Sequence, residues 1–190
     1  MSDPVKTTII TPPATGCYVF LNRPQPSMNP GGEPQYAVTL VFPKTADLRE
    51  LKAAAKAAVE KKWGQKVPTN LRNPFRDGDA EKPDDPTFAN SIYITARTKQ
   101  KPGVVGRDRQ PLPEPDFDLY SGMRCRASVT AFAYDQAGNK GASFALNNVQ
   151  KLGDGERLSG RKPAEAEFAN APALPDEDQP AAPADTNMFD

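Results

Sequence analysis

Histidine is absent from this 190-residue chain, and cysteine occurs only twice. Without histidine the chain lacks Ser-His-Asp and Cys-His catalysis, imidazole metal ligands and an imidazole pH switch. Cys17 and Cys125 lie far apart and form no C-x-x-C motif, which excludes a tetrahedral zinc site and a disulfide framework. No apolar run approaches the roughly 18 residues of a membrane span, and the start, Met1 to Thr8, is polar, unlike a secretion signal. We therefore expect a soluble intracellular protein with no metal and no cofactor.

The charges balance in total but are unevenly distributed. All 24 basic residues lie at or before Lys162 together with 17 acidic ones, so residues 1–162 carry a net charge of +7. Residues 163–190 hold 7 acidic residues and no basic ones, a net charge of −7. A basic body followed by an acidic end is typical of a nucleic-acid-binding domain joined to an interaction tail. The sequence therefore predicts a domain over residues 1–162 and a tail over residues 163–190.

The predicted tail has an unusual ending. Its 28 residues include 5 prolines and 8 alanines, which leaves too little apolar bulk to offset the entropy of ordering the backbone. We therefore expect it to be disordered. Acidic side chains cluster in its middle and large apolar ones adjoin the terminal carboxylate, which favours a partner-binding role over a merely solubilising one. The predicted partner-binding residues are Asp176, Glu177, Asp178, Met188, Phe189 and Asp190.

The patterns along residues 1–162 predict a mainly β domain. Runs of β-branched and aromatic residues, and a turn at Gly138–Gly141, predict strands over residues 15–23, 35–42, 91–101, 122–134 and 142–149. A helix is expected from Asp47, in a capping box with Glu50, to Gly64. Residues 65–90 contain 4 prolines and indicate a long irregular excursion. Five strands, one helix and long loops fit the oligonucleotide/oligosaccharide-binding (OB) fold, a five-stranded Greek-key barrel.

Two of the predicted strands combine cations and aromatic rings on one face with an apolar row on the other. Ile92, Ile94 and Ala96 form one apolar row, and alternate residues from Met123 to Ala133 form the second. Binding single strands without reading sequence requires cations for the backbone and rings for the bases. The predicted DNA-binding residues, including one in the loop after residue 101, are Tyr93, Arg97, Lys99, Lys101, Arg107, Arg124, Arg126, Phe132 and Tyr134.

Aromatic residues near these positions have a competing interpretation. Phe132 either stacks on a base or packs beneath a loop or the helix, because both faces of its strand are apolar there. Aromatic residues in early strands belong to the core more often than to a binding surface. We therefore expect core positions for Tyr18, Phe20, Tyr36 and Phe42.

Two other function classes remain open. One is a non-enzymatic interaction module whose OB-like barrel holds a protein. The other is a magnesium nuclease, because clustered carboxylates are the hard oxygen ligands that this chemistry needs. Its candidate ligands are Asp77, Asp79, Asp84 and Asp85, or Asp116 with Asp118. No Glu-x-Lys or Asp-x-Lys completes the nuclease motif that Pro83-Asp84 would begin, and no G-x-x-x-x-G-K-[ST] loop is present. We therefore expect no catalytic residues.

Several segments carry a family resemblance. They are Tyr36 to Lys44 (YAVTLVFPK), Tyr120 to Arg126 (YSGMRCR), Gly138 to Leu152 (GNKGASFALNNVQKL) and Gly155 to Gly160 (GERLSG). In this order, and followed by an acidic tail ending in Phe189-Asp190, the chain resembles the single-stranded DNA-binding proteins of tailed bacteriophages. More specifically it is similar to a phage family first defined as a domain of unknown function. The resemblance spans most of residues 10–165, together with the tail.

The resemblance implies a function beyond what the residues show by themselves. It implies an OB fold that coats exposed single strands in replication and recombination, in the cytoplasm of the bacterial host cell, and a tail that contacts replication proteins. It does not imply which side chains touch DNA. Our hypothesis is that the acidic tail competes with DNA for the basic body. Phosphate contacts do not depend on base sequence, so double-stranded DNA is a second candidate ligand. A homo-oligomer is a further alternative that the sequence leaves open.

Overall fold

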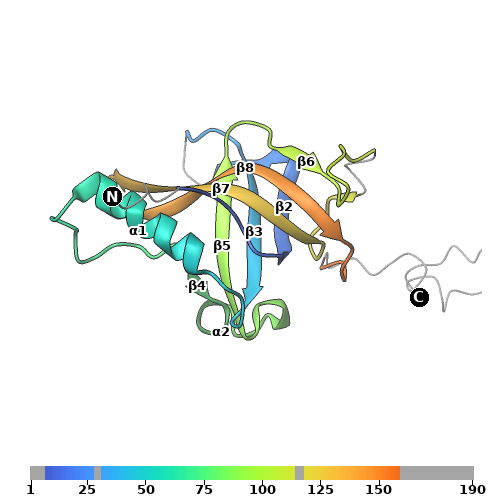
Figure 1. The fold of residues 1–190 in the computed structure, drawn as a ribbon, viewed down its shortest axis with the longest axis horizontal. Helices are drawn as coiled ribbons and strands as arrows, with labels where there is room; N and C mark the ends of the chain where they lie inside the picture. Colours follow the sequence, from blue (N-terminus) through green and yellow to red (C-terminus); the bar gives the residue numbers. More distant parts are fainter. Residues whose placement is uncertain (1–6, 28–30, 114–117, 159–190) are drawn as a thin grey trace, which may run out of the picture. The chain divides into compact units, whose positions relative to one another are not determined.

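Eight β-strands and one long helix dominate residues 7–27, 31–113 and 118–158, the part of the chain that this computed structural model describes (Figure 1). The strands are β1 (Thr8–Ile10), β2 (Ala14–Gln25), β3 (Gln35–Pro43), β4 (Arg76–Asp77), β5 (Ser91–Thr98), β6 (Gly103–Val105), β7 (Arg124–Gln136) and β8 (Asn139–Gly153). The helices are α1 (Arg49–Trp63), the short α2 (Gly78–Glu81) and the 3-10 turn η1 (Pro86–Phe88). The predicted tail, residues 163–190, lies outside the described residues.

The five long strands pair in a closed ring. β2 pairs with β3, β3 with β5, β5 with β8, β8 with β7, and β7 again with β2. Only the β5–β8 pairing in this ring is parallel, and it has two aligned residue pairs, whereas β7 and β8 share 13. Each of these five strands overlaps one predicted from the sequence, although β5 ends at Thr98, before Lys99 and Lys101, and β8 begins at Asn139, within the predicted turn. The predicted fold class, mainly β with one main helix and OB-like, is therefore confirmed.

Alternating side chains fill the inside of this ring. Along β7, Cys125, Ala127, Val129 and Ala131 are buried, while the residues between them are less so. The interior is completed by large apolar side chains of the neighbouring strands, which are Leu21, Val38, Leu40, Phe42, Ile94, Phe144 and Leu146. The predicted apolar row thus lies in the core from Met123 to Ala131, while Ala133 at its end is half-buried, because a period of two places every second side chain on the same side of a sheet.

The helix α1 covers one end of the β7–β8 pair (Figure 1). It buries Leu51, Ala54, Ala55 and Ala58 and ends at Gly64, as predicted, where a positive φ of 59° turns the chain away. None of the helices in the described residues is both long and apolar enough to cross a membrane.

The predicted capping box at the start of α1 is wrong. The helix begins at Arg49 after Leu48, and no side chain caps it. The Asp47 carboxylate instead binds the Arg49 guanidinium, with Oδ2 2.6 Å from Nη2, and accepts a 3.1 Å hydrogen bond from the Arg49 backbone N–H. The hydrogen bonds from the guanidinium and this N–H lower the pKa of Asp47 to about 2. Asp47 is therefore engaged by its neighbour two residues away and does not reach the residue three positions on, as a capping box requires.

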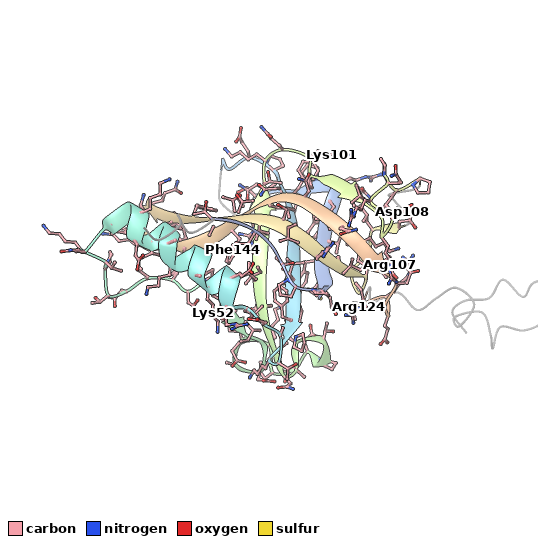
Figure 2. The ribbon with its side chains drawn as sticks, in the orientation of Figure 1. Lys52, Lys101, Arg107, Asp108, Arg124 and Phe144 are labelled. Carbon is pink, nitrogen blue, oxygen red and sulfur yellow. The ribbon has the colours of Figure 1, made fainter. Side chains whose placement is uncertain are left out.

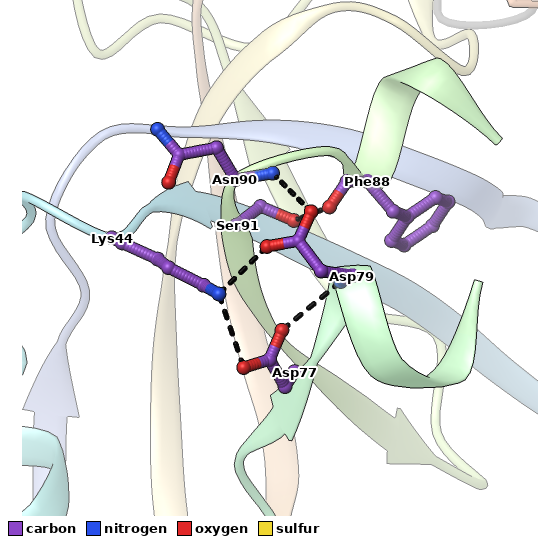
Figure 3. Close-up of polar contacts among 6 residues, drawn as sticks. All are labelled: Lys44, Asp77, Asp79, Phe88, Asn90 and Ser91. Atoms are coloured by element: carbon purple, nitrogen blue, oxygen red, sulfur yellow. Dashed lines mark hydrogen bonds and ion pairs between the residues drawn. The ribbon is translucent and has the colours of Figure 1, made fainter. Parts of the chain in front are cut away.

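The segment between α1 and β5 is attached to the outside of the barrel. Lys44, at the end of β3, forms ion pairs with Asp77 at 3.1 Å and Asp79 at 2.6 Å, and Asp79 also accepts a hydrogen bond from the Asn90 backbone N–H (Figure 3). Beneath this network Phe88 is buried in a second, smaller apolar cluster with Cys17, Val41 and Tyr93. Residues 76–90 therefore cover part of the outer surface of β3 and β5, although the sequence indicated only an irregular excursion.

Both cysteines are buried and unpaired. Burial raises the pKa of the Cys17 thiol to about 11 and that of the Cys125 thiol to about 12, because a thiolate loses its hydration inside the protein. Cys17 belongs to the small outer cluster and Cys125 to the barrel core. Both thiols are therefore packing residues in this fold.

Candidate nucleic-acid interface

A groove of about 720 Å³ follows the outer surface of β3 and β5. Small side chains on the outward positions of the two strands form the bottom of the groove: Ala37 and Thr39 on β3, and Thr95 on β5. Thr39 and Thr95 lie opposite each other, and their hydroxyl oxygens are 3.0 Å apart. β3 and β5 are the second and third long strands of the ring, the face on which OB folds bind oligonucleotides.

Taller side chains from other elements form the walls of the groove. Tyr18, Phe20 and Gln25 come from β2, and the other residues belong to the segment before β5 or to the ends of β7 and β8. They are Arg72, Asn73, Pro74, Arg76, Lys82, Tyr134, Ala142 and Ser143.

The backbone of Arg72 is anchored to the start of β8. Its N–H donates to the Lys140 carbonyl at 2.9 Å, and its own carbonyl accepts from Ala142 at 3.3 Å. A Cβ atom on the intervening Gly141 would lie 2.8 Å from the Arg72 carbonyl oxygen, so this approach requires glycine. The anchored backbone places the Arg72 side chain at the groove.

The groove lining is cationic. Arg72, Arg76, Lys82 and Arg97 contribute to it, and no carboxylate is among the described residues that line it. Arg76 is neutralised by Glu81, with Nη1 2.7 Å from Oε2. Among the described residues, by contrast, no carboxylate lies within ion-pair distance of the Arg72 or Arg97 guanidinium. The groove therefore offers unneutralised positive charge next to aromatic rings, the combination that single-strand binding requires.

Three of the nine predicted DNA-binding residues line this groove: Tyr93, Arg97 and Tyr134. Tyr93 lies on the outer side of β5, opposite the apolar row, as alternation predicts, but its side chain is only 5% exposed. Its ring packs edge-on against Phe88 with centroids 5.0 Å apart, and its hydroxyl donates to Glu81 at 3.1 Å. Residues 76–90 therefore cover most of this side chain, although it still contributes to the groove lining.

The other six predicted residues lie outside the lining of this groove: Lys99, Lys101, Arg107, Arg124, Arg126 and Phe132. Lys99 forms an ion pair with Glu33. Phe132 is 43% exposed, and its ring centroid is 6.4 Å from that of Tyr134.

The remaining arginines form a second basic surface near the start of β7. Gln150 accepts a hydrogen bond from Arg126 Nε at 2.8 Å and donates to the Arg107 carbonyl at 3.3 Å, so these two residues are neighbours. Figure 2 shows Arg107 and Arg124 toward the C-terminal end of β8, and Lys101 at the connection between β5 and β6. The ten residue-to-residue steps from Arg124 to Tyr134 span about 33 Å of extended strand. The single face predicted from strand alternation therefore divides into a groove and a separate basic surface.

Sequence reasoning missed most of the groove walls. Arg72, Arg76 and Lys82 belong to the excursion, whose proline-rich sequence has no period from which a face could be assigned. Tyr18 is 47% exposed, so the core position expected for it is wrong, whereas Phe42 is fully buried as expected. Phe20 and Tyr36 are half-buried, and Phe20 lines the groove.

Three of the acidic residues considered as metal ligands, Asp77, Asp79 and Asp85, have other partners. Asp77 and Asp79 share the Lys44 ammonium (Figure 3), and hydrogen bonding to that ammonium lowers the pKa of Asp79. Asp85 accepts from the Thr87 backbone N–H at 3.0 Å and so caps η1. Within residues 7–27, 31–113 and 118–158, no three His, Cys, Asp or Glu side chains are grouped as metal ligands would be. Asp116 and the six predicted tail residues lie outside the described residues.

Comparison with known proteins gives consistent similarities. Residues 7–179 match the family described as the Enterobacter phage Enc34 ssDNA-binding protein. Protein p50 of Acyrthosiphon pisum secondary endosymbiont phage 1 is 30% identical over 156 residues, covering 76% of this chain and 83% of that protein.

Solved structures share the fold. The Enc34 single-stranded DNA-binding protein in complex with ssDNA has a TM-score of 0.70 and 23% identity, over 80% of this chain and 89% of that one. The gp2.5 single-stranded DNA-binding protein of bacteriophage T7 has a TM-score of 0.54 and 15% identity, over 84% of this chain and 98% of that one.

Proposed function

Because the chain belongs to the family of the Enterobacter phage Enc34 ssDNA-binding protein, we propose that it binds single-stranded DNA without reading its sequence. The observation that carries this proposal is the groove over β3 and β5, whose described lining has four cations and no carboxylate. We assign the phosphates to this groove, with Arg72 and Arg97 as the principal contacts. Tyr134 is the predicted aromatic residue that remains available there for a base. A base offers a π-face whatever its identity, so such contacts tolerate any sequence.

The proposed role is to coat single strands in replication and recombination in the cytoplasm of the bacterial host. The protein acts in this role by binding and carries out no reaction. Double-stranded DNA is a weaker ligand, held by phosphates alone, because paired and stacked bases present no free faces. The apolar and acidic end of the tail, from Met188 to Asp190, recruits replication proteins through a basic, apolar pocket on the partner. Homo-oligomer formation along a strand is compatible with this role.

A titration of labelled oligo(dT) in EDTA, repeated with a duplex of equal length across a salt series, tests the function. We expect tighter binding of the single strand, and the logarithm of the affinity should fall with that of salt by about 0.7 for each phosphate contact. Contacts from the three groove cations other than Arg76, which is paired with Glu81, give a slope of about −2.1. Absence of binding at any salt concentration would favour an interaction module, and cleavage that requires magnesium would favour a nuclease.

Removing the tail after Lys162 should increase the affinity for oligo(dT) several-fold. The tail carries a net charge of −7 and the remaining body +7, and a tethered polyanion competes at an effective concentration in the range of about 1 mM. The slope of the logarithm of affinity against that of salt should also steepen. In the full-length protein DNA displaces tail carboxylates that already neutralise the body, whereas in the truncated protein these carboxylates are absent. Fluorescence anisotropy measures both quantities. A full-length variant with Asp176, Glu177 and Asp178 changed to Asn, Gln and Asn should behave as an intermediate. Weaker binding by the truncated protein would refute tail competition.

A further inference from the structure

The side chain of Tyr18 is unusual for an aromatic residue in a barrel strand. It is 47% exposed, and its backbone has a φ of 47°, in the left-handed region that residues other than glycine rarely adopt. Such backbone outliers persist only where the surrounding structure holds them, and they concentrate at functional sites. The position of Tyr18 therefore calls for a specific reason.

A β-bulge is the local cause of this geometry. Cys17 lies opposite Thr39 and Phe20 lies opposite Ala37, so three steps along β2 correspond to two along β3. A bulge of this kind re-aims a side chain, and bulges are frequent beside binding sites. Here it places two consecutive residues on the outer face: Cys17 joins the small outer cluster and Tyr18 lines the groove, while Val19 packs against the barrel core.

The ring of Tyr18 is supported by residues of the excursion. Phe88, which is 1% exposed, lies behind it with ring centroids 6.3 Å apart and planes inclined by 29°. Lys82 donates to the Tyr18 hydroxyl at 2.9 Å, and its Nζ lies 4.8 Å from the Tyr18 ring centroid. That hydrogen bond also raises the pKa of Lys82, so the ammonium stays charged at neutral pH. The ring is thus held in place before any ligand arrives, with its exposed half at the groove.

We infer that Tyr18 is a preset base-stacking platform of the groove and that Lys82 contacts the phosphate next to the stacked base. This inference rests on the proposed function and adds a subsite to it. A fixed ring loses little side-chain entropy on binding, and a cation beside it matches the alternation of base and phosphate along a strand. Residues 76–90 thereby have a role in binding, because they supply both Phe88 behind the ring and Lys82 at its hydroxyl end.

Oligonucleotides with and without bases distinguish a stacking role of Tyr18 from a purely structural one. Tyr18→Ala should lower the affinity for oligo(dT) about tenfold, because it removes the ring on which one base stacks. On an abasic oligonucleotide of the same length, the same variant should bind within twofold of the wild type. Tyr18→Phe, which keeps the ring and loses the bond to Lys82, should lose clearly less on oligo(dT) than Tyr18→Ala. Lys82→Met should weaken both oligonucleotides equally, and Lys66→Met, outside the groove, is its charge-matched control.

The inference would be refuted if Tyr18→Ala bound oligo(dT) with wild-type affinity, or if its affinity fell equally for oligo(dT) and the abasic oligonucleotide. Tyr18→Gly is the second variant, because glycine accepts the positive φ without strain and removes the ring while keeping the bulge. Its loss should match that of Tyr18→Ala, with the thermal midpoint recorded for each variant. Failure of the wild type to bind oligo(dT) would instead reject the proposed function, so the two failures are distinguishable.

Discussion

Replacing Arg72 and Arg97 together by alanine is expected to lower the affinity for oligo(dT) about a hundredfold at low salt. Both side chains line the groove, and their guanidinium charges are not neutralised by carboxylates of the described chain. A charge-assisted hydrogen bond contributes roughly 1.5–3 kcal/mol, and about 1.4 kcal/mol corresponds to a factor of ten. The salt slope should become shallower by about 1.4, since two phosphate contacts are lost. Fluorescence anisotropy from low to high salt measures the affinity and the slope together.

The matched control removes the same charge from the second basic surface. Arg124→Ala with Arg126→Ala lowers the net charge by the same amount, but neither residue lines the groove. We expect less than a threefold change in affinity and a slope close to that of the wild type. Equal losses in the two double variants would show that strand alternation identified the binding face better than the groove does. Thermal unfolding of both proteins checks that the barrel is intact.

Gly122→Ala is expected to destabilise the barrel by at least about 3 kcal/mol, because strained backbone costs roughly 1–3 kcal/mol before any clash is added. Gly122 has a φ of +109°, and a Cβ there would lie 1.7 Å from the Glu156 carbonyl oxygen. Its N–H donates to Gly16 at 2.8 Å, which joins the start of β7 to β2. The segment after β8 would have to move away, and this connection would be distorted. Urea denaturation monitored by circular dichroism measures the free energy of unfolding.

Gly153→Ala is the control for this substitution. Nothing lies within 4 Å of a Cβ at Gly153, and its φ is outside the strained range. Substitutions away from buried or strained features usually change stability by less than about 0.5 kcal/mol. A similar, small effect at both positions would show that the close approach of Gly122 to Glu156 is not maintained in solution.

The barrel strands were predictable because their signal is local and periodic. Alternation of apolar and polar side chains over residues 122–134 identified the row from Cys125 to Ala131 that is buried in the structure. The helix was predictable for the same reason, since Leu51, Ala55 and Ala58 repeat at helical spacing and Gly64 ends it. By contrast, β1, β4 and β6 have only two or three residues each, too few to show a period. Their pairing depends on neighbours that are distant in the sequence.

The candidate site was only partly predictable because its walls depend on tertiary contacts. Arg97 and Tyr134 followed from alternation, but nothing in the local sequence indicates that residues 76–90 cover Tyr93. The bulge in β2 is equally hidden, since it is an offset between β2 and β3 and not a property of Cys17 and Tyr18 alone. Arg72 reaches the groove because Gly141 allows two backbones to approach closely, a contact between residues about seventy positions apart.

The short parallel pairing of β5 with β8 has a consequence for how the protein responds to its ligand. It has two aligned pairs, Ala96 with Phe144 and Arg97 with Ala145. Together with the equally short β2–β7 pairing, it is among the smallest pairings of the ring, so local opening and amide hydrogen exchange are expected to be easier there than along β7 and β8. Arg97 and Ser143, on either side of that pairing, both line the groove. A polymer lying across both residues would hold β5 and β8 together, so ligand binding should slow amide exchange at this short pairing as well as raise the stability of the whole domain.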